Sequence, residues 1–414
     1  HLYSVDHDPA SSRFLIESNW KALNFRLLET DLNNSSDKNK WKELIPHREQ
    51  VLLQSVIPFP DHLIIMEREN GLRKLKILHK ESKAVKEINF NDPTYTAYLA
   101  SNPEYYVDRF YFGYSSMRTP DSLFSVVLSN GRKRLLKQAE VKGVFSSSDY
   151  KVEREFITAR DGTQVPVSIV YKKNTFKKNE NPIFLYGYGS YGNSIDAGFS
   201  SSRLSLLDRG FIFAIAHVRG GQELGRSWYE DGKIFNKLNT FYDFIDVTKG
   251  LLDKGYGDKD RIYAGGGSAG GLLMGAIVNM EPNLYKGIIS NVPFVDVITT
   301  MSDPSIPLTT GEYSEWGNPD IKEEFEYIMQ YSPYDNISEQ EYPSILVTAG
   351  LWDSQVQYYE PAKYVAKLRD YNKGKNPILM KVNMTAGHSG VSGRFESLKE
   401  LAMEYAFLLR LDSN

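Results

Sequence analysis

Short apolar runs separated by turn-forming residues fill roughly the first 148 residues of the chain. Three related stretches recur there, and Phe14, Leu63 and Phe110 hold matching places in them, at intervals of 49 and 47 residues. This interval is the period of a four-stranded β-propeller blade. The pattern predicts about three blades within residues 1–148, with a generic antiparallel sheet of accidental spacing as the alternative.

Three blades are too few to close a ring, because propellers usually need four to eight. An open set would leave strand edges unpaired, and unpaired edges favour aggregation. We therefore expect further blades, either in a part of the protein that precedes this sequence or on a separate chain that pairs with it.

From about Val152 the pattern changes to short apolar runs that end in loops and alternate with helix-like stretches. Examples of the apolar runs are "NPIFLYGYGSYG", "FIFAIAHVRGG", "RIYAGGGSAGG" and "SILVTAGLWD". Alternation of strand and helix predicts a parallel sheet covered on both faces, with functional groups where the strands end. We expect one α/β domain over residues 149–414, entered through a β-hairpin.

Composition and charge narrow the classes of function. The chain has 49 Lys and Arg against 52 Asp and Glu, and its net charge of −3 disfavours a general nucleic-acid binder. The lack of Cys excludes disulfides, thiolate metal sites and a cysteine nucleophile. The longest apolar run is far shorter than a spanning helix, so we expect no membrane insertion. We expect a cytoplasmic protein, and a periplasmic location stays open because the true N-terminus, before His1, is not visible.

A glycine-dense turn between a predicted strand and a predicted helix offers a nucleophile. The residues Gly266-Gly267-Ser268-Ala269-Gly270 fit the pattern G-x-S-x-G. Such a turn strains the backbone of the central residue and needs small neighbours, so that the hydroxyl stands exposed at the helix N-terminus. The amide of Ala269 would then point to the place where an oxyanion forms.

Two other interpretations of this turn are open. Gly265, Gly267 and Gly270 also fit the dinucleotide-binding fingerprint, which needs an acidic residue about twenty positions further on. The segment "YKGIISNVPF" offers none, Asp296 comes late, and the turn lies in the middle of its domain rather than at the start. A plain glycine turn for close packing is the third interpretation, and the nucleophile is favoured over both.

A serine hydroxyl is a poor nucleophile until a base takes its proton. The second half of the chain contains two histidines, His217 and His388. On α/β-hydrolase folds the order along the chain is serine, acid and histidine. His388, in the loop "TAGHSG" just past a predicted strand, is therefore the predicted base, and His217 is expected to be structural.

The acid should lie at a strand end between the serine and the histidine. Asp353, in "ILVTAGLWDSQV", fits this place and would hold the imidazole in the required tautomer. Its alternative role is to cap the helix that follows. Asp335 and Asp296 are rival acids of lower rank, because no clear strand precedes Asp335 and Asp296 lies nearer the serine.

With these residues in place, the chain resembles the prolyl oligopeptidase family of serine peptidases over essentially its whole length. The resemblance is carried by "YGYGSYGNSIDA", "HVRGGQELGRSWYEDGK", "GGSAGG", "PLTTGEYSEWGNP", "SPYDN", "DSQVQYYEPAKYVAKLR" and "GHSGVSGRFE". "DSQV" is similar to the oligopeptidase B branch, since prolyl-specific relatives carry Arg where Gln355 stands. The resemblance implies an α/β-hydrolase domain capped by a seven-bladed propeller that admits short peptides, so about four blades would lie outside this sequence.

The resemblance also implies roles for individual residues. It places the catalytic triad on Ser268, Asp353 and His388, as the search from the residues does, and the oxyanion tyrosine on Tyr188, the second tyrosine of "YGYG". A phenol and the amide of Ala269 would together stabilise the tetrahedral intermediate. This chemistry requires neither a cofactor nor a metal ion.

The oligopeptidase B branch cleaves after Arg or Lys, which calls for carboxylates in the pocket. Two of these carboxylates fall on Glu312 and Asp196, the predicted substrate-binding residues. Their usual acidic companions are replaced by Ser314 and Gly198, so we expect a weakened preference for a basic P1 residue and a still weaker dibasic preference. Glu315 would either compensate or be a solvated charge.

These residues predict a serine oligopeptidase that hydrolyses short peptides through an acyl-enzyme. An esterase or other acyl hydrolase on the same fold is one alternative, because a fold does not settle its substrate. A catalytically inert fragment or binding protein is the other, because the predicted blades do not complete a ring.

Overall fold

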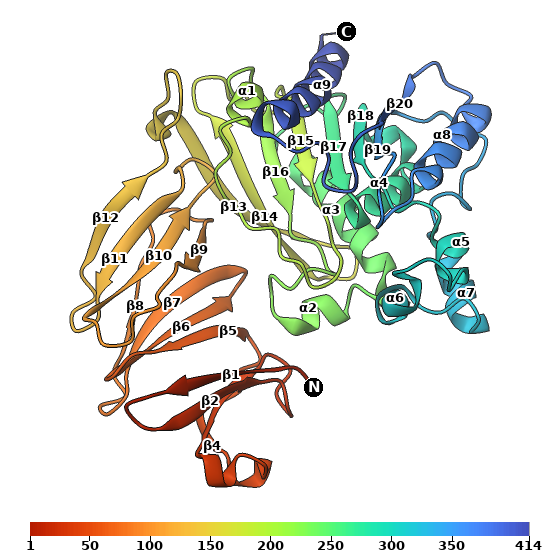
Figure 1. The fold of residues 1–414 in the computed structure, drawn as a ribbon. Helices are drawn as coiled ribbons and strands as arrows, with labels where there is room; N and C mark the ends of the chain where they lie inside the picture. The colour runs from red at the N-terminus through yellow and green to blue at the C-terminus, as the bar shows by residue number, and fades with distance from the viewer. Residues whose placement is uncertain (414) are drawn as a thin grey trace. The chain divides into compact units, whose positions relative to one another are not determined.

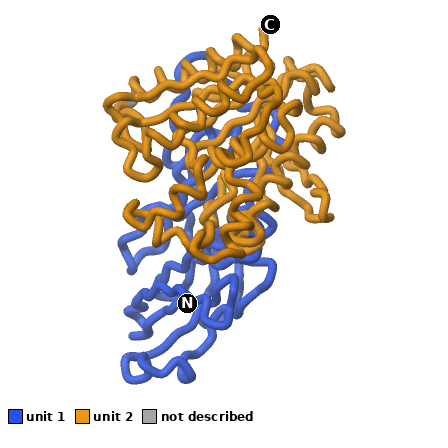
Figure 2. The backbone as a smooth tube through the Cα atoms, turned by 90° about the vertical axis from the view of Figure 1, so that its right-hand side faces the viewer, with its two compact units in different colours: residues 1–153, 196–201, 222–228 blue, residues 154–195, 202–221, 229–414 orange. Residues whose placement is uncertain are grey.

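The computed structural model describes residues 1–413, and only the backbone of residue 394. Its contacts divide the chain into two compact units (Figure 2). The first comprises residues 1–153, 196–201 and 222–228, and the second comprises residues 154–195, 202–221 and the chain from Tyr229 onward. The domain boundary at residue 148 stays a prediction. Two short segments that follow it in the chain, residues 196–201 and 222–228, group with the first unit.

The first unit contains three sheets, each built from four consecutive antiparallel strands (Figure 1). The first sheet has β1 (Tyr3–Asp8), β2 (Arg13–Ser18), β3 (Arg26–Thr30) and β4 (Lys42–Ile45). The second has β5 (Val51–Pro58), β6 (His62–Glu69), β7 (Leu72–His79) and β8 (Val85–Glu87). The third has β9 (Thr96–Leu99), β10 (Arg109–Ser115), β11 (Ser122–Val127) and β12 (Lys133–Gln138).

The repeat in the sequence corresponds to these three sheets. Phe14, Leu63 and Phe110 are each the second residue of the second strand of their sheet. Leu63 packs in an apolar cluster with residues of the first sheet, while the adjacent Ile64 packs in a cluster with residues of the third. Neighbouring residues of a strand point to opposite faces, so the middle sheet is covered on both sides. The prediction of about three blades is confirmed.

The second unit is built on one eight-stranded sheet in the order β13-β14-β16-β15-β17-β18-β19-β20. Strands β14 and β16 pair antiparallel, and the pairs from β16 to β20 are parallel. The strands are β13 (Tyr150–Thr158), β14 (Gln164–Lys172), β15 (Ile183–Tyr186), β16 (Ile212–Ala216), β17 (Ile262–Gly267), β18 (Gly287–Asn291), β19 (Ser344–Gly350) and β20 (Ile378–Asn383).

Helices cover this sheet. The α-helices are α1 (Leu204–Leu207), α2 (Arg226–Glu230), α3 (Leu238–Asp253), α4 (Ala269–Met280), α5 (Val297–Ser302), α6 (Thr309–Trp316), α7 (Lys322–Ile328), α8 (Tyr359–Tyr371) and α9 (Arg394–Asp412). Short 3₁₀ turns span Leu32–Asn34, Lys38–Lys40, Ser147–Asp149, Ile234–Asn236 and Pro282–Leu284. None of the helices among residues 1–413 combines the length and apolar character needed to cross a membrane.

The burial of the central strands explains why this part of the chain folds as an α/β layer. The first five residues of β17 are all buried in succession, and six of the seven residues of β19 are buried. Because successive side chains point to opposite faces, such runs require cover on both sides. Helix α4 packs on β17 and β18, and α8 packs on β19 and β20. The predicted α/β-hydrolase architecture is confirmed.

Register brings the ends of the parallel strands to one edge. Tyr186 of β15 pairs with Gly265 of β17, and Asn291 of β18 pairs with Gly267 of β17 and with Thr348 of β19. The loops that leave these strands carry four of the predicted site residues. Tyr188 follows β15, Ser268 follows β17, Asp353 follows β19 and His388 follows β20.

Candidate active site

Ser268 lies between the last residue of β17 and the first residue of α4, with φ 56° and ψ −118°. A positive φ is rare for a residue with a side chain, and it persists only where the surroundings impose it. The strained backbone that the G-x-S-x-G pattern predicts is therefore present. The Ser268 side chain forms no capping hydrogen bond to α4, so its hydroxyl is not engaged by the helix it precedes.

The two outer glycines of the pattern make this turn possible. A Cβ added to Gly266 would lie 2.4 Å from the carbonyl oxygen of Gly270 and 2.9 Å from that of Gly187. A Cβ added to Gly270 would lie 2.8 Å from the same Gly187 oxygen. Real side chains do not approach backbone this closely, so the strand, the helix and the loop after β15 can meet only where both positions are glycine.

Backbone hydrogen bonds fix the serine in this turn. Its N–H donates to the carbonyl oxygen of Asn291 at 2.8 Å, and its own carbonyl oxygen accepts from Gly271 at 2.9 Å and from Phe294 at 3.1 Å. The next amide, that of Ala269, is the first N–H of α4, and the first amides of a helix have no acceptor within it. It is available to a negatively charged oxygen beside Ser268.

Asp353 and His388 form a hydrogen-bonded pair. The distance between Asp353 Oδ2 and His388 Nδ1 is 2.8 Å, and the two side chains are 1% and 15% exposed. A carboxylate at Nδ1 favours the tautomer that carries its proton there, which leaves Nε2 free to accept one. The other oxygen, Asp353 Oδ1, accepts the amides of Gln355 and Val356, each at 2.9 Å. This carboxylate therefore holds both the imidazole and the loop that presents it.

The rival residues are engaged elsewhere. Asp335 accepts the hydroxyl of Ser332 at 2.6 Å. Asp296 precedes α5, accepts the Thr299 amide at 3.4 Å and forms an ion pair with Lys363. His217 is buried, and its Nε2 is 2.7 Å from the hydroxyl of Ser168. Each residue that was predicted with lower rank than Asp353 or His388 thus has a structural partner of its own.

The predicted link between Ser268 and His388 is not a hydrogen bond within the described residues. In the described part of the chain, Asp353 and His388 are joined, whereas Ser268 Oγ and His388 are not hydrogen-bonded to each other. Catalytic hydrogen bonds are often long in an unliganded enzyme and tighten when substrate binds. The loop that carries His388 lies between β20 and α9, and it must place Nε2 within hydrogen-bond reach of the serine for the triad to act.

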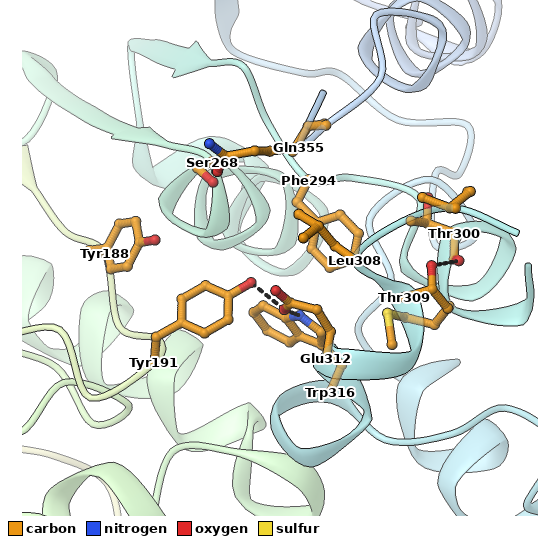
Figure 3. A pocket seen from close by; sticks show the side chains of 13 residues that line it. Tyr188, Tyr191, Ser268, Phe294, Thr300, Leu308, Thr309, Glu312, Trp316 and Gln355 are labelled. Carbon is orange, nitrogen blue, oxygen red and sulfur yellow. Dashed lines mark hydrogen bonds between the residues drawn. The ribbon is translucent and has the colours of Figure 1, made fainter. Parts of the chain in front are cut away.

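Tyr188 and Ser268 line the same cavity, of about 310 Å³ (Figure 3). Burial raises the pKa of the Tyr188 phenol to about 12, and a side-chain hydrogen bond with Ser268 offsets part of that rise. The phenol therefore keeps its proton at neutral pH and can donate it in a hydrogen bond. A phenol and a backbone amide that both lie near the serine can stabilise an oxyanion.

The cavity is lined by apolar and by uncharged polar side chains and, among the described residues, by one carboxylate. It is lined by Tyr188, Tyr191, Ser268, Phe294, Thr300, Met301, Ile306, Leu308, Thr309, Glu312, Trp316, Gln355 and Val356. Glu312 Oε2 accepts the hydroxyl of Tyr191 at 2.6 Å and the indole N–H of Trp316 at 2.8 Å (Figure 3). These two donors orient the carboxylate through Oε2, whereas Oε1 has no hydrogen bond within the described residues and can face a ligand.

The other predicted specificity residues do not gather in this cavity. Glu315 is 3% exposed, so it is not a solvated charge. It is also not among the described residues that line the cavity, and it accepts the Tyr191 amide and the Tyr229 hydroxyl instead. Asp196 belongs to the first compact unit, where its two oxygens pair with Arg68 at 2.8 Å and Arg73 at 3.0 Å.

Sequence reasoning missed two residues of this site, Tyr191 and Trp316. Both contact the Glu312 carboxylate, and their rings pack edge to face with centroids 5.6 Å apart. The signal was present, because both lie inside the stretches that carried the resemblance. Within the described residues, no group of three or more His, Cys, Asp or Glu side chains is arranged to hold a metal ion.

Comparison with known proteins agrees with this architecture. The model of the prolyl oligopeptidase family matches residues 197–413, and the model of the prolyl oligopeptidase N-terminal beta-propeller domain matches residues 1–139. Dipeptidyl aminopeptidase BI of Pseudoxanthomonas mexicana is 47% identical over 98% of this chain and 56% of its own length. Protease 2 of Moraxella lacunata is 45% identical over 99% of this chain and 58% of its own.

Solved structures give the same result. Oligopeptidase B from Leishmania major matches with a TM-score of 0.94 and 41% identity, over 99% of this chain and 58% of that one. Oligopeptidase B from Trypanosoma brucei with covalently bound antipain matches with a TM-score of 0.94 and 40% identity, over 99% of this chain and 59% of that one. The chain spans somewhat more than half the length of these relatives. It belongs to the prolyl oligopeptidase family.

Proposed function

We propose that this protein is a serine peptidase that hydrolyses short peptides through an acyl-enzyme on Ser268. The observation that carries the proposal is the hydrogen bond between Asp353 and His388, which leave adjacent strands, at the edge of the sheet where β17 ends in the strained Ser268. A strained serine, an oriented imidazole and a buried carboxylate are the parts that acyl transfer needs.

The proposed reaction runs in two halves. His388 Nε2 takes the proton of Ser268 as Oγ attacks the substrate carbonyl carbon, and the negative charge on the carbonyl oxygen is held by the Tyr188 hydroxyl and the Ala269 amide. The imidazolium then gives its proton to the leaving amine, which departs and leaves an acyl-enzyme. Water then attacks the acyl carbon with His388 again as base, the bond to Ser268 Oγ breaks as the imidazolium returns its proton to Oγ, and the acyl group leaves as a carboxylic acid.

A fluorophosphonate probe and a substrate panel test this proposal on the 414-residue chain. We expect the probe to label Ser268 and peptide arylamides to be hydrolysed. Hydrolysis of esters without any amide would favour an acyl hydrolase instead, and failure of both labelling and hydrolysis would contradict the proposal. Substrates with blocked and with free amino ends would separate internal cleavage from release of N-terminal dipeptides, the activity named for the Pseudoxanthomonas relative.

We propose that the cavity beside Ser268 receives the P1 side chain and that Glu312 recognises a basic one weakly. The apolar side chains in its lining, such as Ile306 and Leu308, suit a long alkyl chain, and the Glu312 carboxylate can pair with the cation at the end. With Ser314 in place of a second carboxylate, preference for Arg and Lys should persist but be modest. Equal kcat/KM for Arg, Lys and neutral P1 substrates would contradict this preference.

Replacing Glu312 with Gln is expected to lower kcat/KM for Arg and Lys substrates by about 10- to 100-fold, because the cavity loses the negative charge that pairs with the cation. Substrates with a neutral P1 residue should change little, since Gln can still accept from Tyr191 and Trp316. Glu326→Gln, in an exposed pair on α7, is the matched control. An equal loss on basic and neutral substrates would assign Glu312 a structural role.

We propose that Asp196 is not a substrate carboxylate in this protein. Its two oxygens are already paired with Arg68 and Arg73, and Arg68 is only 2% exposed. These two guanidinium groups neutralise the negative charge of Asp196, with which a basic P2 side chain would have to pair. Gly198 leaves no carboxylate in the neighbouring place, so the dibasic preference should be absent.

Asp196→Asn is therefore expected to leave the ratio of kcat/KM for basic and neutral P2 residues unchanged. The same substitution should lower the free energy of unfolding by about 1–3 kcal/mol, because it leaves a buried guanidinium without its counter-charge. Chemical denaturation measures the second effect. A loss of P2 selectivity at unchanged stability would restore Asp196 to the substrate site.

A further inference from the structure

The loop between β15 and residue 193 carries two tyrosines of the site, Tyr188 and Tyr191. Its backbone has a positive φ at three positions, 74° at Gly189, 62° at Tyr191 and 64° at Gly192, of which only the tyrosine is strained. A left-handed conformation at a tyrosine is unfavourable by itself. Contacts with the rest of the second unit must therefore hold the loop in this shape.

Lys237 holds one side of the loop. It precedes α3, is 0% exposed, and donates to the Gly189 carbonyl oxygen at 2.6 Å, the Ser190 hydroxyl at 2.8 Å and the Gly232 carbonyl oxygen at 3.2 Å. An ammonium has three donors, and burying it is costly unless they are satisfied. Here each donor has one acceptor, and two of the three acceptors belong to the loop.

Glu315 holds the residue that follows. This buried carboxylate accepts the Tyr191 amide at 2.8 Å through Oε1 and the Tyr229 hydroxyl at 2.5 Å through Oε2. A buried cation thus takes the acceptors of residues 189 and 190, and a buried anion takes the donor of residue 191. Opposite charges fix three consecutive positions directly after Tyr188.

Close backbone packing leaves the loop little room to move away from Lys237. A Cβ on Gly220 would lie 1.9 Å from the Gly189 carbonyl oxygen, and a Cβ on Gly232 would lie 2.0 Å from the Gly220 nitrogen. The Gly189 carbonyl oxygen therefore packs directly against the backbone of Gly220, where no side chain could fit. Burial lowers the pKa of Lys237 to about 8, and Glu315 partly opposes this shift, so the ammonium form is favoured at neutral pH.

We propose that Lys237 and Glu315 are positioning residues for the hydrolysis, holding the loop so that the Tyr188 hydroxyl faces the oxyanion and the Tyr191 hydroxyl faces Glu312. Neither side chain lines the cavity among the residues described, so each acts through the loop rather than on substrate. This inference rests on the proposed function, because it takes Tyr188 as the oxyanion donor.

A double-mutant cycle tests it. Lys237→Met and Glu315→Gln are made in the natural chain and in Tyr188→Phe, and kcat and KM are measured with peptide arylamides. Each single variant is expected to lower kcat by about 10- to 100-fold, as displaced oxyanion donors do, with little change in KM. In the Tyr188→Phe background the same substitutions should cost less than about threefold, because the hydroxyl they position is gone.

A transition-state mimic supplies a second readout. A peptide aldehyde forms a tetrahedral adduct with the serine, so its inhibition constant should rise in parallel with the fall in kcat. A peptide that binds without forming the adduct should keep its affinity. Lys249→Met is the matched control, since Lys249 lies on the surface of α3, the helix that Lys237 precedes, in an exposed pair with Glu281. Its kcat should match that of the natural chain.

Glu315→Gln keeps the shape of its side chain but loses the negative charge that strengthens the hydrogen bonds from the Tyr191 amide and the Tyr229 hydroxyl. It keeps the test open if Lys237→Met does not fold. Equal losses with and without the Tyr188 hydroxyl would overturn the inference, and so would an unchanged kcat in a folded Glu315→Gln. These results differ from failure of the proposed function, in which the natural chain itself neither hydrolyses peptides nor reacts with a fluorophosphonate.

Discussion

Ser268→Ala is expected to lower kcat by roughly 10⁶-fold, the scale on which loss of a catalytic serine acts in serine peptidases. The reason is that no other group can accept the acyl chain at this turn, and the remaining oxyanion donors only polarise the carbonyl for attack by water. Steady-state hydrolysis of peptide arylamides measures the loss. A fluorophosphonate probe should no longer label the chain.

The same substitution should leave the fold intact. The Ser268 side chain makes no capping hydrogen bond to α4, and alanine meets the same strain at φ 56°. The thermal midpoint of unfolding should therefore not fall. Ser129→Ala, at an exposed serine, is the control and should keep both activity and labelling. Residual hydrolysis above about 1% of the natural rate in Ser268→Ala would require a different nucleophile.

The parts of the site that could be predicted from the sequence are those fixed by neighbouring residues. The strain at Ser268 follows from its position between small residues at a strand-to-helix turn, and the glycines at 266 and 270 are needed for backbone approach within that same turn. The order of serine, acid and histidine along the chain narrowed the choice of the acid and the base, because few strand ends after Ser268 carry an Asp, a Glu or a His. The three-blade pattern was predictable for a similar reason, since each blade repeats one local arrangement.

The parts that could not be predicted depend on partners far away along the chain. Glu315 was expected to be either a specificity carboxylate or a solvated charge. Its carboxylate instead accepts a hydrogen bond from the Tyr191 amide, which lies 124 positions earlier. The substrate role of Asp196 stays a prediction, but its pairing with Arg68, 128 positions away, could not be predicted. Lys237 gave no signal at all. A motif identifies a side chain, whereas its partners decide whether that charge faces solvent, substrate or backbone.

Asp353→Asn tests the pair on which the proposed function depends. The carbonyl oxygen of Asn can still accept the Gln355 and Val356 amides that Asp353 Oδ1 holds at 2.9 Å, so the loop should keep its shape. The amide nitrogen, however, would face His388 Nδ1 as a donor. Nδ1 must then accept, the proton moves to Nε2, and the imidazole can no longer take the proton of Ser268.

A wrong tautomer of this kind is expected to lower kcat by about 10⁴-fold at neutral pH, with KM little changed. Asp335→Asn is the matched control, because Asp335 is bonded to Ser332 and not to the imidazole, and its kcat should stay near that of the natural chain. If the kcat of Asp353→Asn stayed within tenfold of that of the natural chain, the hydrogen bond between Asp353 and His388 would only shape the loop. A loss in Asp335→Asn instead would move the acid to the rival position, since only the carboxylate that orients the base can exert an effect this large through a change of one atom.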